Sequence, residues 1–313
     1  MPEAILITGA AGYIGSKLAE RLSNSFEVVG VDIREPLKPC GKFYCCDIRD
    51  PQLKTIVAEN NIKRVVHLAS VLESSKDEQR DYDIDVNGTR NVIEACLEGK
   101  VEQLIVTSSG AAYGYHADSP AWIDEQDALR GNLEIPYSHH KYLVEQLLAE
   151  TRQQHPGLKQ LVLRPGTVLG ANTRNQITNL FEKRFVLGIR GSDTPFVFIW
   201  DEDVLGVIEQ GLRNGQQGIF NLAGDGCLSI AEIAQRLKKP LLKLPAALIR
   251  SALGVGHALG LSRYSPVQVK FIRYRPVLHN RRLKEEFGYQ LQKTSAETFD
   301  YFLEHARARG QIA

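Results

Sequence analysis

Three glycines that follow a short apolar run at the start of the chain constrain its fold more than any other feature. Residues 4–7 read Ala-Ile-Leu-Ile, and this run predicts a buried parallel strand. Gly9, Gly12 and Gly15 come next, and residues 16–22 have the pattern of a helix. Glycines at these positions allow a tight turn, a close approach of the backbone to a ligand and close packing of the helix on the strand. Because the free N–H groups at a helix start attract anions, the pattern predicts a site for a dinucleotide phosphate.

A second predicted strand ends on an acidic residue at the distance that such a site requires. Residues 28–31 form the strand, and Asp32 follows it about 20 residues after Gly9. An aspartate at this place accepts hydrogen bonds from a ribose 2′-OH and repels a 2′-phosphate, so NAD is expected rather than NADP. Arg34 is the opposing signal, because an arginine can pair with a phosphate. A glycine loop at a helix start without any ligand is the alternative.

Length, charge and cysteine content exclude several classes of protein. The 313 residues can bury a large core, and a net charge of +1 indicates neither a nucleic-acid partner nor an anionic membrane. The chain begins directly with a strand, so no leader segment is expected. Five cysteines without Cys-x-x-Cys spacing predict reduced thiols in a cytoplasmic protein, with no metal site. Residues 241–261 are apolar, but charges and glycines interrupt them, and we expect one or two helices there rather than a membrane span.

Strand and helix patterns alternate through the first half of the chain. Strands are expected at residues 65–68, 103–107 and 160–163, and helices at residues 86–97 and 137–152. This alternation is typical of the α/β class, with a doubly wound parallel sheet that has helices on both faces.

The pattern becomes irregular after Arg164-Pro165. We expect a helix at residues 177–187, strands at 196–199 and 219–222, and a helix at 230–237 that Ser229 caps. The chain is expected to return to the sheet near residues 196–223, which leaves a smaller, discontinuous lobe.

Tyr137 and Lys141 are the candidate catalytic pair. They lie four residues apart on a predicted helix and therefore on one face of it. A nearby ammonium favours the phenolate, so the tyrosine can remove a proton from an alcohol or return one to a carbonyl. Ser109 follows a predicted strand whose carboxyl end should face the same ligand crevice, and its hydroxyl can hold the substrate oxygen. His140 falls between the pair and is expected to face elsewhere, without a catalytic role.

These motifs together resemble the extended short-chain dehydrogenases/reductases, the family that includes nucleotide-sugar epimerases and dehydratases. The resemblance runs along most of the chain and rests on the following segments: Thr8-Gly-Ala-Ala-Gly-Tyr-Ile-Gly15, Asp32, Asp47-Ile48, His67-Leu-Ala-Ser70, Asn87-Gly-Thr89, Ser109, Tyr113-Gly114, Tyr137 to Lys141, and Arg164-Pro165.

The resemblance implies roles for particular residues. It makes Ser109, Tyr137 and Lys141 a catalytic triad, and it implies a homodimer through a four-helix bundle that includes the Tyr137 helix. The residues expected to bind the cofactor, from the motifs and the resemblance together, are Gly9, Gly12, Tyr13, Ile14, Gly15, Asp32, Ile33, Arg34, Asp47, Ile48, Leu68, Ala69, Ser70, Asn87, Thr107, Tyr137, Lys141, Pro165 and Val168.

Two departures from the family's pattern bear on the reaction. Dehydratases usually carry Asp-Glu after the catalytic hydroxyl residue, whereas Gly110-Ala111 stand here, which disfavours dehydration. Members of the family that bind nucleotide sugars often carry an arginine just before the strand that leads into the acidic motif, where it contacts the diphosphate. In this chain no arginine is adjacent to Phe196, which begins that strand. Other arginines could compensate, namely Arg174, Arg190, Arg273, Arg275, Arg281 and Arg282. For those near the C-terminus, the alternative is a solvated helix start.

We therefore expect a Rossmann NAD-binding domain at residues 1–165 plus about 196–240, and a substrate lobe at about 166–195 plus 241–313. The predicted function is that of an NAD-dependent epimerase acting on a UDP- or dTDP-sugar as its small-molecule partner, with no nucleic acid, no membrane and no metal. One alternative is a dehydrogenase or ketone reductase for non-nucleotide alcohols such as hydroxysteroids. A second is a regulatory protein that senses NAD without catalysis.

Overall fold

The structure of the chain is a computed structural model that describes residues 2–73, 75–260 and 266–312. It forms two compact units. Unit 1 consists of Met1–Ser109, His140–Arg164 and Asp201–Phe220, and unit 2 consists of Gly110–His139, Pro165–Trp200 and Asn221–Ala313. Unit 2 therefore includes residues 110–139, which lie within the first of the two predicted domains.

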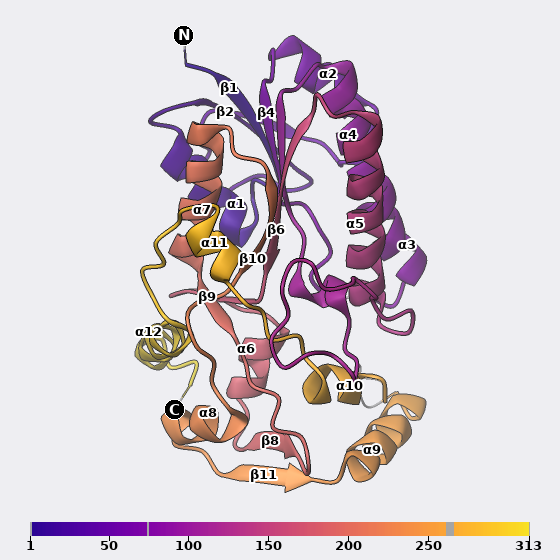
Figure 1. The fold of residues 1–313 in the computed structure, drawn as a ribbon, viewed down its shortest axis with the longest axis vertical. Coiled ribbons are helices and arrows are strands. Elements are labelled where there is room, and N and C mark those ends of the chain that lie inside the picture. Colours follow the sequence, from indigo (N-terminus) through magenta and orange to yellow (C-terminus); the bar gives the residue numbers. More distant parts are fainter. Residues whose placement is uncertain (1, 74, 261–265, 313) are drawn as a thin grey trace. The chain divides into compact units, whose positions relative to one another are not determined.

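A seven-stranded sheet with the order β10-β6-β5-β4-β1-β2-β3 forms the centre of the Rossmann-like fold (Figure 1). Its strands are β1 (Ala4–Thr8), β2 (Glu27–Asp32), β3 (Lys42–Cys45), β4 (Arg64–His67), β5 (Gln103–Thr107), β6 (Lys159–Pro165) and β10 (Gly218–Leu222). The pairs from β3 through β6 are parallel. Leu6 lies in register with Val29 and Val65, and all three side chains are fully buried. Apolar runs such as the one in β1 form strands because both faces of the sheet are covered.

Helices cover both faces of this sheet in unit 1. Figure 1 shows α1 (Tyr13–Leu22) and α7 (Asp201–Asn214) on one face. The other face carries α2 (Gln52–Glu59), α4 (Gly88–Glu98) and α5 (Pro136–Gln154). Short α3 (Glu78–Tyr82) and the π-helix η1 (Asp83–Asn87) precede α4. The expected class, a doubly wound α/β sheet, is confirmed.

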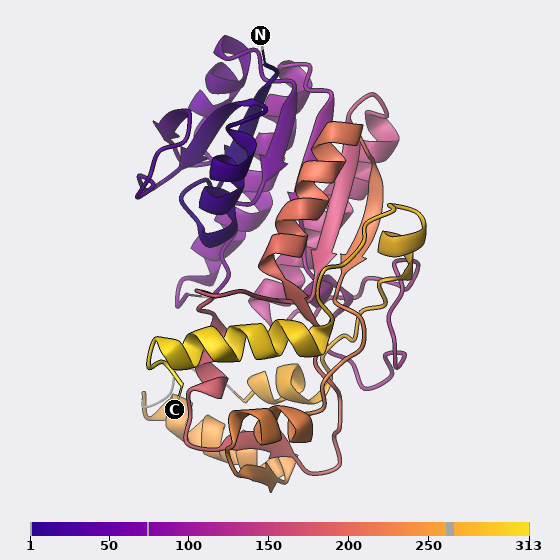
Figure 2. The same cartoon turned by 90° about the vertical axis from the view of Figure 1, so that its left-hand side faces the viewer.

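Unit 2 contains two small parallel sheets and several helices (Figure 2). One sheet pairs β7 (Thr167–Leu169) with β9 (Phe198–Trp200), and the other pairs β8 (Val186–Ile189) with β11 (Leu241–Leu244). Its helical elements are η2 (Gly110–Tyr113), α6 (Gln176–Phe181), α8 (Ile230–Leu237), α9 (Ala246–Ala258), α10 (Gln268–Arg273), α11 (Arg281–Glu285) and α12 (Ser295–Ala308).

Aromatic side chains form much of the core of unit 2. The Phe198 ring stacks on Phe196 with ring centroids 5.7 Å apart and on Phe299 at 5.4 Å. Phe181 packs edge-on to Phe299 at 5.3 Å. Large rings at these distances contribute contact energy beyond the area that they bury, so they hold α6, α12 and the β7–β9 sheet together.

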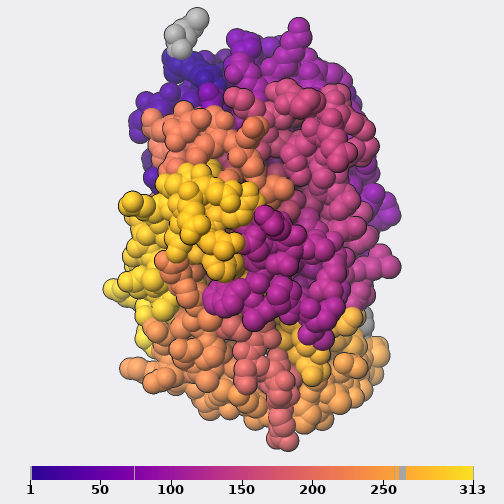
Figure 3. All heavy atoms as spheres, viewed as in Figure 1, coloured from indigo at the N-terminus to yellow at the C-terminus, as the bar shows by residue number. Residues whose placement is uncertain are grey.

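Residues 110–139 join unit 2 through the loop that follows η2. Ile123 and Leu278 form a parallel β-bridge, Ile123 N–H donates to Val277 O, and His279 N–H donates to Ile123 O. Figure 3 shows this loop, in purple, against the yellow segment near residue 280. Because these bonds join residues more than 150 positions apart, the sequence pattern around residue 123 does not predict them.

Three expectations for the second half of the chain are wrong in whole or in part. Residues 177–187 form α6 and then β8, not one helix. The strand expected at residues 196–199 is β9, which pairs with β7 and not with the central sheet, whereas β10 does join that sheet. The helix expected within residues 241–261 is present as α9, but β11 precedes it, and residue 261 lies outside the described residues. Short apolar runs fit a strand or a helix equally well, and the choice depends on the partner that each finds.

Other local predictions are confirmed. Ser229 caps α8 by accepting a hydrogen bond from Glu232 N–H, and the Glu232 carboxylate accepts one from Ser229 N–H. Pro136 is the first residue of α5, where its missing N–H costs nothing. No helix in the described part of the chain is both long and apolar enough to cross a membrane.

Candidate active site

The glycine turn after β1 has the tight geometry that the sequence predicts. Gly9 has φ of +72°, and a Cβ on it would come within 2.8 Å of Ala69 N. A Cβ on Gly15 would come within 2.1 Å of Gly9 O. Gly12 is the N-cap residue of α1, and no side chain caps the helix. The turn therefore leaves the first N–H groups of α1 open to an anion such as a pyrophosphate.

Asp32 is the last residue of β2 and lies at the carboxyl end of the sheet, next to the glycine turn. Its Oδ2 accepts a hydrogen bond from Ala11 N at 3.0 Å, and its Oδ1 accepts one from Arg34 N at 3.2 Å. These bonds fix the carboxylate beside the glycine turn, where a ribose hydroxyl can reach it. Ile33 and Arg34 are exposed next to it.

Tyr13 joins α1 to α7. Its hydroxyl donates to Asp201 Oδ2 at 2.6 Å, and Lys17 Nζ lies 2.6 Å from the same oxygen. Burial lowers the pKa of Lys17, but the hydrogen bonds to Asp201 and Glu202 outweigh it and raise that pKa above its ordinary value. The side chains of Tyr13 and Lys17 therefore hold the helix that begins the turn, while Ile14 is half-buried in its first turn.

Asp47 and Ile48 follow β3 and differ in environment. Arg49 binds both oxygens of Asp47, at 3.0 and 2.7 Å, and this pairing lowers the pKa of Asp47. Ile48 is buried, and a Cβ on Gly88 would lie 2.6 Å from its Cδ1. Ile48 thus packs on the start of α4, and Asp47 lies at the surface beside it.

The segment after β4 contacts the glycine turn. Leu68 N–H donates to Thr8 O at 3.2 Å, Ala69 N–H donates to Thr8 Oγ1 at 3.4 Å, and Ser70 Oγ donates to Asp85 Oδ1 at 2.9 Å. Asn87 is exposed, and its Nδ2 donates to Asp83 Oδ1 at 2.8 Å. The structure therefore brings Leu68, Ala69 and Ser70 beside the turn and leaves Asn87 at the surface of η1.

Lys141 reaches the carboxyl end of β5. Its side chain is buried, and Nζ donates to Thr107 O at 3.4 Å. Ser109, also buried, lies two residues after the end of this strand. Lys141 and the residues that end β5 are thus neighbours within unit 1, as the doubly wound topology requires.

Tyr137 lies one turn before Lys141 on α5. It packs with Ala111, Tyr115 and Ile135 in unit 2 and is half-buried. Ser138 Oγ donates to Ala111 O at 2.7 Å and fixes the start of the helix. Tyr137 and Lys141 therefore share one face of a single continuous helix, as their spacing predicts.

Pro165 and Val168 lie in the segment that leaves the central sheet. Pro165 ends β6 and is half-buried, and Gly166 N–H donates to Leu222 O at 2.9 Å. Val168 lies in β7, and its carbonyl accepts a hydrogen bond from Asn175 Nδ2 at 3.5 Å.

Arg275 has the most unusual environment among the arginines that the sequence names. Its guanidinium carbon lies 3.3 Å from the centroid of the Phe196 ring, and the side chain lines a shallow hollow with Ser192, Thr194 and Ile230. Burial lowers the pKa of Arg275 to about 9, although Tyr115 acts in the opposite direction. No carboxylate within the described residues pairs with it. A stacked guanidinium of this kind suits an anionic ligand.

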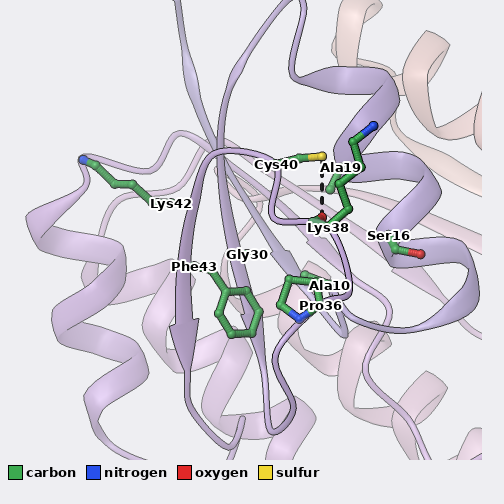
Figure 4. A pocket seen from close by; sticks show the side chains of 9 residues that line it. All are labelled: Ala10, Ser16, Ala19, Gly30, Pro36, Lys38, Cys40, Lys42 and Phe43. Atoms are coloured by element: carbon green, nitrogen blue, oxygen red, sulfur yellow. Dashed lines mark hydrogen bonds between the residues drawn. The ribbon is translucent and has the colours of Figure 1, made fainter.

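A second hollow lies in unit 1 (Figure 4). Ala10, Ser16 and Gly30 line it, together with Pro36 and Phe43. None of the residues predicted to bind the cofactor lines this hollow, and we assign it no ligand. The part of the chain that the structure describes also contains no group of three or more histidine, cysteine or acidic side chains able to hold a metal ion.

Asp85 and His140 are the residues that the sequence analysis missed. Asp85 was not singled out, and His140 was given no role, yet both are buried and their side chains approach to 3.4 Å. The sequence does contain a signal for them, because each is an ionisable residue next to positions that are buried. The contact between Asp85 and His140 joins η1 to α5, and no pattern of neighbouring residues predicts it.

The fold and the site define an NAD-dependent enzyme of the extended short-chain dehydrogenase/reductase type. The model of the NAD dependent epimerase/dehydratase family matches residues 5–194, and the chain belongs to that family. The expected family, enzyme class and cofactor are thereby confirmed. The open N-terminus of α1 and the glycine turn, which a Cβ would fill, fit the dinucleotide.

Two relatives show how far this similarity extends. An uncharacterised protein of Mycobacterium tuberculosis is 23% identical over 321 residues, which cover 99% of this chain and 85% of that protein. The UDP-glucose 4-epimerase of Haemophilus influenzae is 33% identical over 186 residues, which cover 54% of each chain.

Among solved structures, the UDP-glucose 4-epimerase of Thermotoga maritima with UDP-glucose is similar with a TM-score of 0.78 and 21% identity. The match covers 98% of this chain and 99% of that one. At this identity the similarity establishes the fold.

Proposed function

We propose that the protein is an epimerase that inverts a secondary alcohol of a nucleotide sugar, of the UDP-sugar 4-epimerase type. The observation that carries the proposal is the placement of Tyr137 and Lys141 one turn apart at the start of α5, with Lys141 Nζ at the carboxyl end of β5.

The three proposed catalytic residues divide the work. Tyr137 takes the proton from the substrate hydroxyl and returns it at the end of the reaction. Lys141 stabilises the phenolate with its ammonium and holds the nicotinamide ribose. Ser109 donates a hydrogen bond to the substrate oxygen. NAD held at the glycine turn and Asp32 would supply a reversible acceptor for hydride, and epimerisation would require the ketone to turn between oxidation and reduction, with no net redox change.

A nucleotide diphosphate explains the environment of Arg275. The relative from H. influenzae and the structural neighbour from T. maritima are both UDP-glucose 4-epimerases, and the latter was solved with UDP-glucose. Arg275, stacked on Phe196, is the guanidinium in unit 2 that we propose to bind the diphosphate. This arginine takes the place of the one missing next to Phe196 in the sequence.

The test is turnover of UDP-glucose and dTDP-glucose by the NAD-saturated protein, with product sugars resolved by chromatography. We expect Tyr137→Phe to lower kcat by about 100-fold or more, because it removes the proton-transferring group. Equal turnover by wild type and Tyr137→Phe contradicts the proposed chemistry. Steady release of NADH with a simple secondary alcohol favours the dehydrogenase alternative instead.

The substrate class has its own test at Arg275. Arg275→Gln should weaken UDP binding by about 10-fold or more, since a guanidinium bound to phosphate contributes about 1.5–3 kcal/mol. The matched control is Arg250→Gln, which changes an exposed arginine on α9 in the same unit. Isothermal titration with UDP measures both variants. Unchanged UDP affinity in Arg275→Gln would remove the support for a nucleotide substrate.

We further propose a homodimer in the cytoplasm. The family resemblance supports the dimer, and all five cysteines are free thiols, as a reducing compartment permits. Sedimentation of the purified protein tests the dimer: a single species with the mass of one chain, 34.9 kDa, contradicts it.

A further inference from the structure

Helix α9 in unit 2 carries apolar side chains on its outer side as well as on its inner side. The inner side packs in a small core with β8, β11 and α10, where Ile249 is buried and Leu253 is half-buried. On the outer side, Leu248, Val255 and Leu259 are 54%, 61% and 65% exposed. Figure 1 shows this helix after β11 in the lower part of the view. A surface helix ordinarily turns polar residues outward, so the exposed apolar side is unusual.

The outer side chains of α9 form one continuous stripe. Leu248, Ala252, Val255 and Leu259 follow one another at intervals of four, three and four residues, which places them on one face of the helix. The helical backbone extends as far as Leu259, whose N–H donates to Val255 O at 3.0 Å. Ala258 and Ser251, both exposed, widen the stripe. Exposed apolar surface that is gathered in this way marks a site of interaction.

The segment that contains α9 is strongly basic. Residues 233–284 hold twelve lysines and arginines and no acidic residue. The whole chain has 38 basic and 37 acidic residues, so the remainder has 26 basic and 37 acidic ones and a net charge of −11. The net charge of +1, which by itself indicates no anionic partner, is therefore the sum of two opposed parts. The positive part lies entirely in unit 2.

The cations of this segment keep a positive excess in the folded chain. Arg250 lies on α9 and is exposed. Lys243 Nζ lies 3.1 Å from Asp193 Oδ1, and Lys270 Nζ lies 2.6 Å from Glu134 Oε1. Within the described residues, carboxylates from outside the segment pair in this way with six of the twelve cations. These pairs are mostly between exposed side chains, so their charges remain available to an anionic surface.

We propose that α9 docks the protein on the surface of a lipid bilayer that contains anionic lipids. The stripe of Leu248, Val255 and Leu259 enters the boundary between headgroups and acyl chains, and Arg250 and the other cations of the segment lie against the lipid phosphates. Apolar burial and attraction to anionic lipids together are what hold amphipathic helices at such a boundary. The inference rests on unit 2 alone and does not depend on the proposed function.

The size and charge of the face favour a bilayer over other occupants. A stable protein interface buries about 800 Å² on each partner, from about 20–30 residues, and α9 offers one face of a 13-residue helix. A second copy of the chain in a symmetric contact would bring the same basic segment onto both sides of the interface, where like charges repel. A span of the bilayer needs about 20 residues, so the helix lies on the membrane rather than across it.

The test is co-sedimentation of the full chain with vesicles of phosphatidylcholine, with or without about 30% phosphatidylglycerol. We expect binding to the anionic vesicles to be at least about 10-fold tighter than to the neutral ones, and most of that difference to disappear at about 0.5 M salt. Leu248→Ser/Val255→Ser should weaken binding by about 10-fold or more, because it removes apolar area that enters the bilayer. Leu37→Ser/Leu133→Ser is the matched control, since these leucines are 108% and 78% exposed on other segments, and it should bind as wild type does.

A pair of variants at Ser251 separates docking from a defect in the fold. Glutamate and lysine are both good helix formers at this exposed position and differ in the sign of their charge. Ser251→Glu should weaken binding to the anionic vesicles by about fivefold, and Ser251→Lys should strengthen it by a similar factor. A structural defect would affect both variants in the same direction. Thermal melting of each variant without vesicles should match that of wild type.

The outcomes that overturn the inference are distinct from those that bear on the reaction. Failure of wild type to bind either kind of vesicle, wild-type binding by Leu248→Ser/Val255→Ser, or equal effects of the two Ser251 variants each overturns it. Sedimentation without vesicles tests the second copy as occupant: a wild-type dimer that this double variant converts to a monomer also overturns the inference. Because vesicle binding is measured without nucleotide or sugar, none of these results decides the proposed epimerase activity.

Discussion

One buried pair of side chains with opposite charges holds helix α5 against the sheet in unit 1. Arg164 and Glu145 are 3% and 2% exposed, and the guanidinium binds both carboxylate oxygens, Nε to Oε1 at 2.8 Å and NH2 to Oε2 at 2.9 Å. This bidentate pair joins β6 to α5, in the helix that carries Tyr137 and Lys141. Removing one partner of such a pair leaves the other as an uncompensated buried charge, which destabilises the folded state.

Glu145→Ala should therefore destabilise the fold strongly. We expect the free energy of unfolding to fall by about 3–5 kcal/mol, because a buried guanidinium loses its counter-charge. Glu150→Ala changes an exposed glutamate on the same helix and should alter stability by about 0.5 kcal/mol or less. Urea denaturation followed by circular dichroism compares the two variants. Equal stability of Glu145→Ala and wild type would show that the pair adds nothing to folding.

At the level of the element, the junction of β1 and α1 depends on the absence of side chains. Gly9 adopts a left-handed conformation, and Gly15 lies against Gly9 O with no room for a Cβ. The conformation of the turn and the position of the start of α1 thus depend on each other, and α7 holds α1 in place through Asp201. A substitution that moves this turn should affect the cofactor before it affects the rest of the fold.

Gly15→Ala tests this dependence. A methyl group 2.1 Å from Gly9 O must displace the turn, and we expect NADH affinity to fall by about 10-fold or more, together with a stability loss of about 1–3 kcal/mol. Gly157→Ala is the control, since nothing lies within 4 Å of the position of its Cβ. Fluorescence titration and thermal melting measure both effects. An unchanged NADH affinity in Gly15→Ala would show that the turn does not hold the pyrophosphate.

For the molecule as a whole, the buried neutral side chain of His67 makes the free energy of unfolding depend on pH. In the folded chain burial lowers the pKa of His67 from 6.5 to about 3. The unfolded chain therefore binds a proton at a higher pH than the folded chain does. The contribution of His67 to stability is complete above pH 6.5 and is lost progressively as the pH falls toward 3.

We predict that the unfolding free energy of wild type falls relative to that of His67→Gln by about 1.4 kcal/mol for each pH unit within this range. His155→Gln removes an exposed histidine and should keep the wild-type dependence. Chemical denaturation at several pH values gives the difference between the variants. Parallel curves for wild type and His67→Gln would show that His67 titrates equally in both states.

Much of the fold and of the candidate site follows from local pattern. The glycine turn, the acid that ends β2 and the cap of α8 are set by backbone conformations and hydrogen bonds within a few residues. The spacing of Tyr137 and Lys141 determines their common face wherever a helix forms. These features could be predicted because each depends only on residues that are close in the sequence.

The sequence by itself determined the alternation of strands and helices in the first half of the chain, the glycine turn and the family. The tertiary structure decided that β9 pairs with β7, that the Arg275 guanidinium stacks on Phe196, and that Asp85 meets His140. Each of these outcomes joins residues separated by about 30 to 80 positions. Their energy comes from packing and charge that exist only once distant segments have been brought together, so no local pattern of residues encodes them.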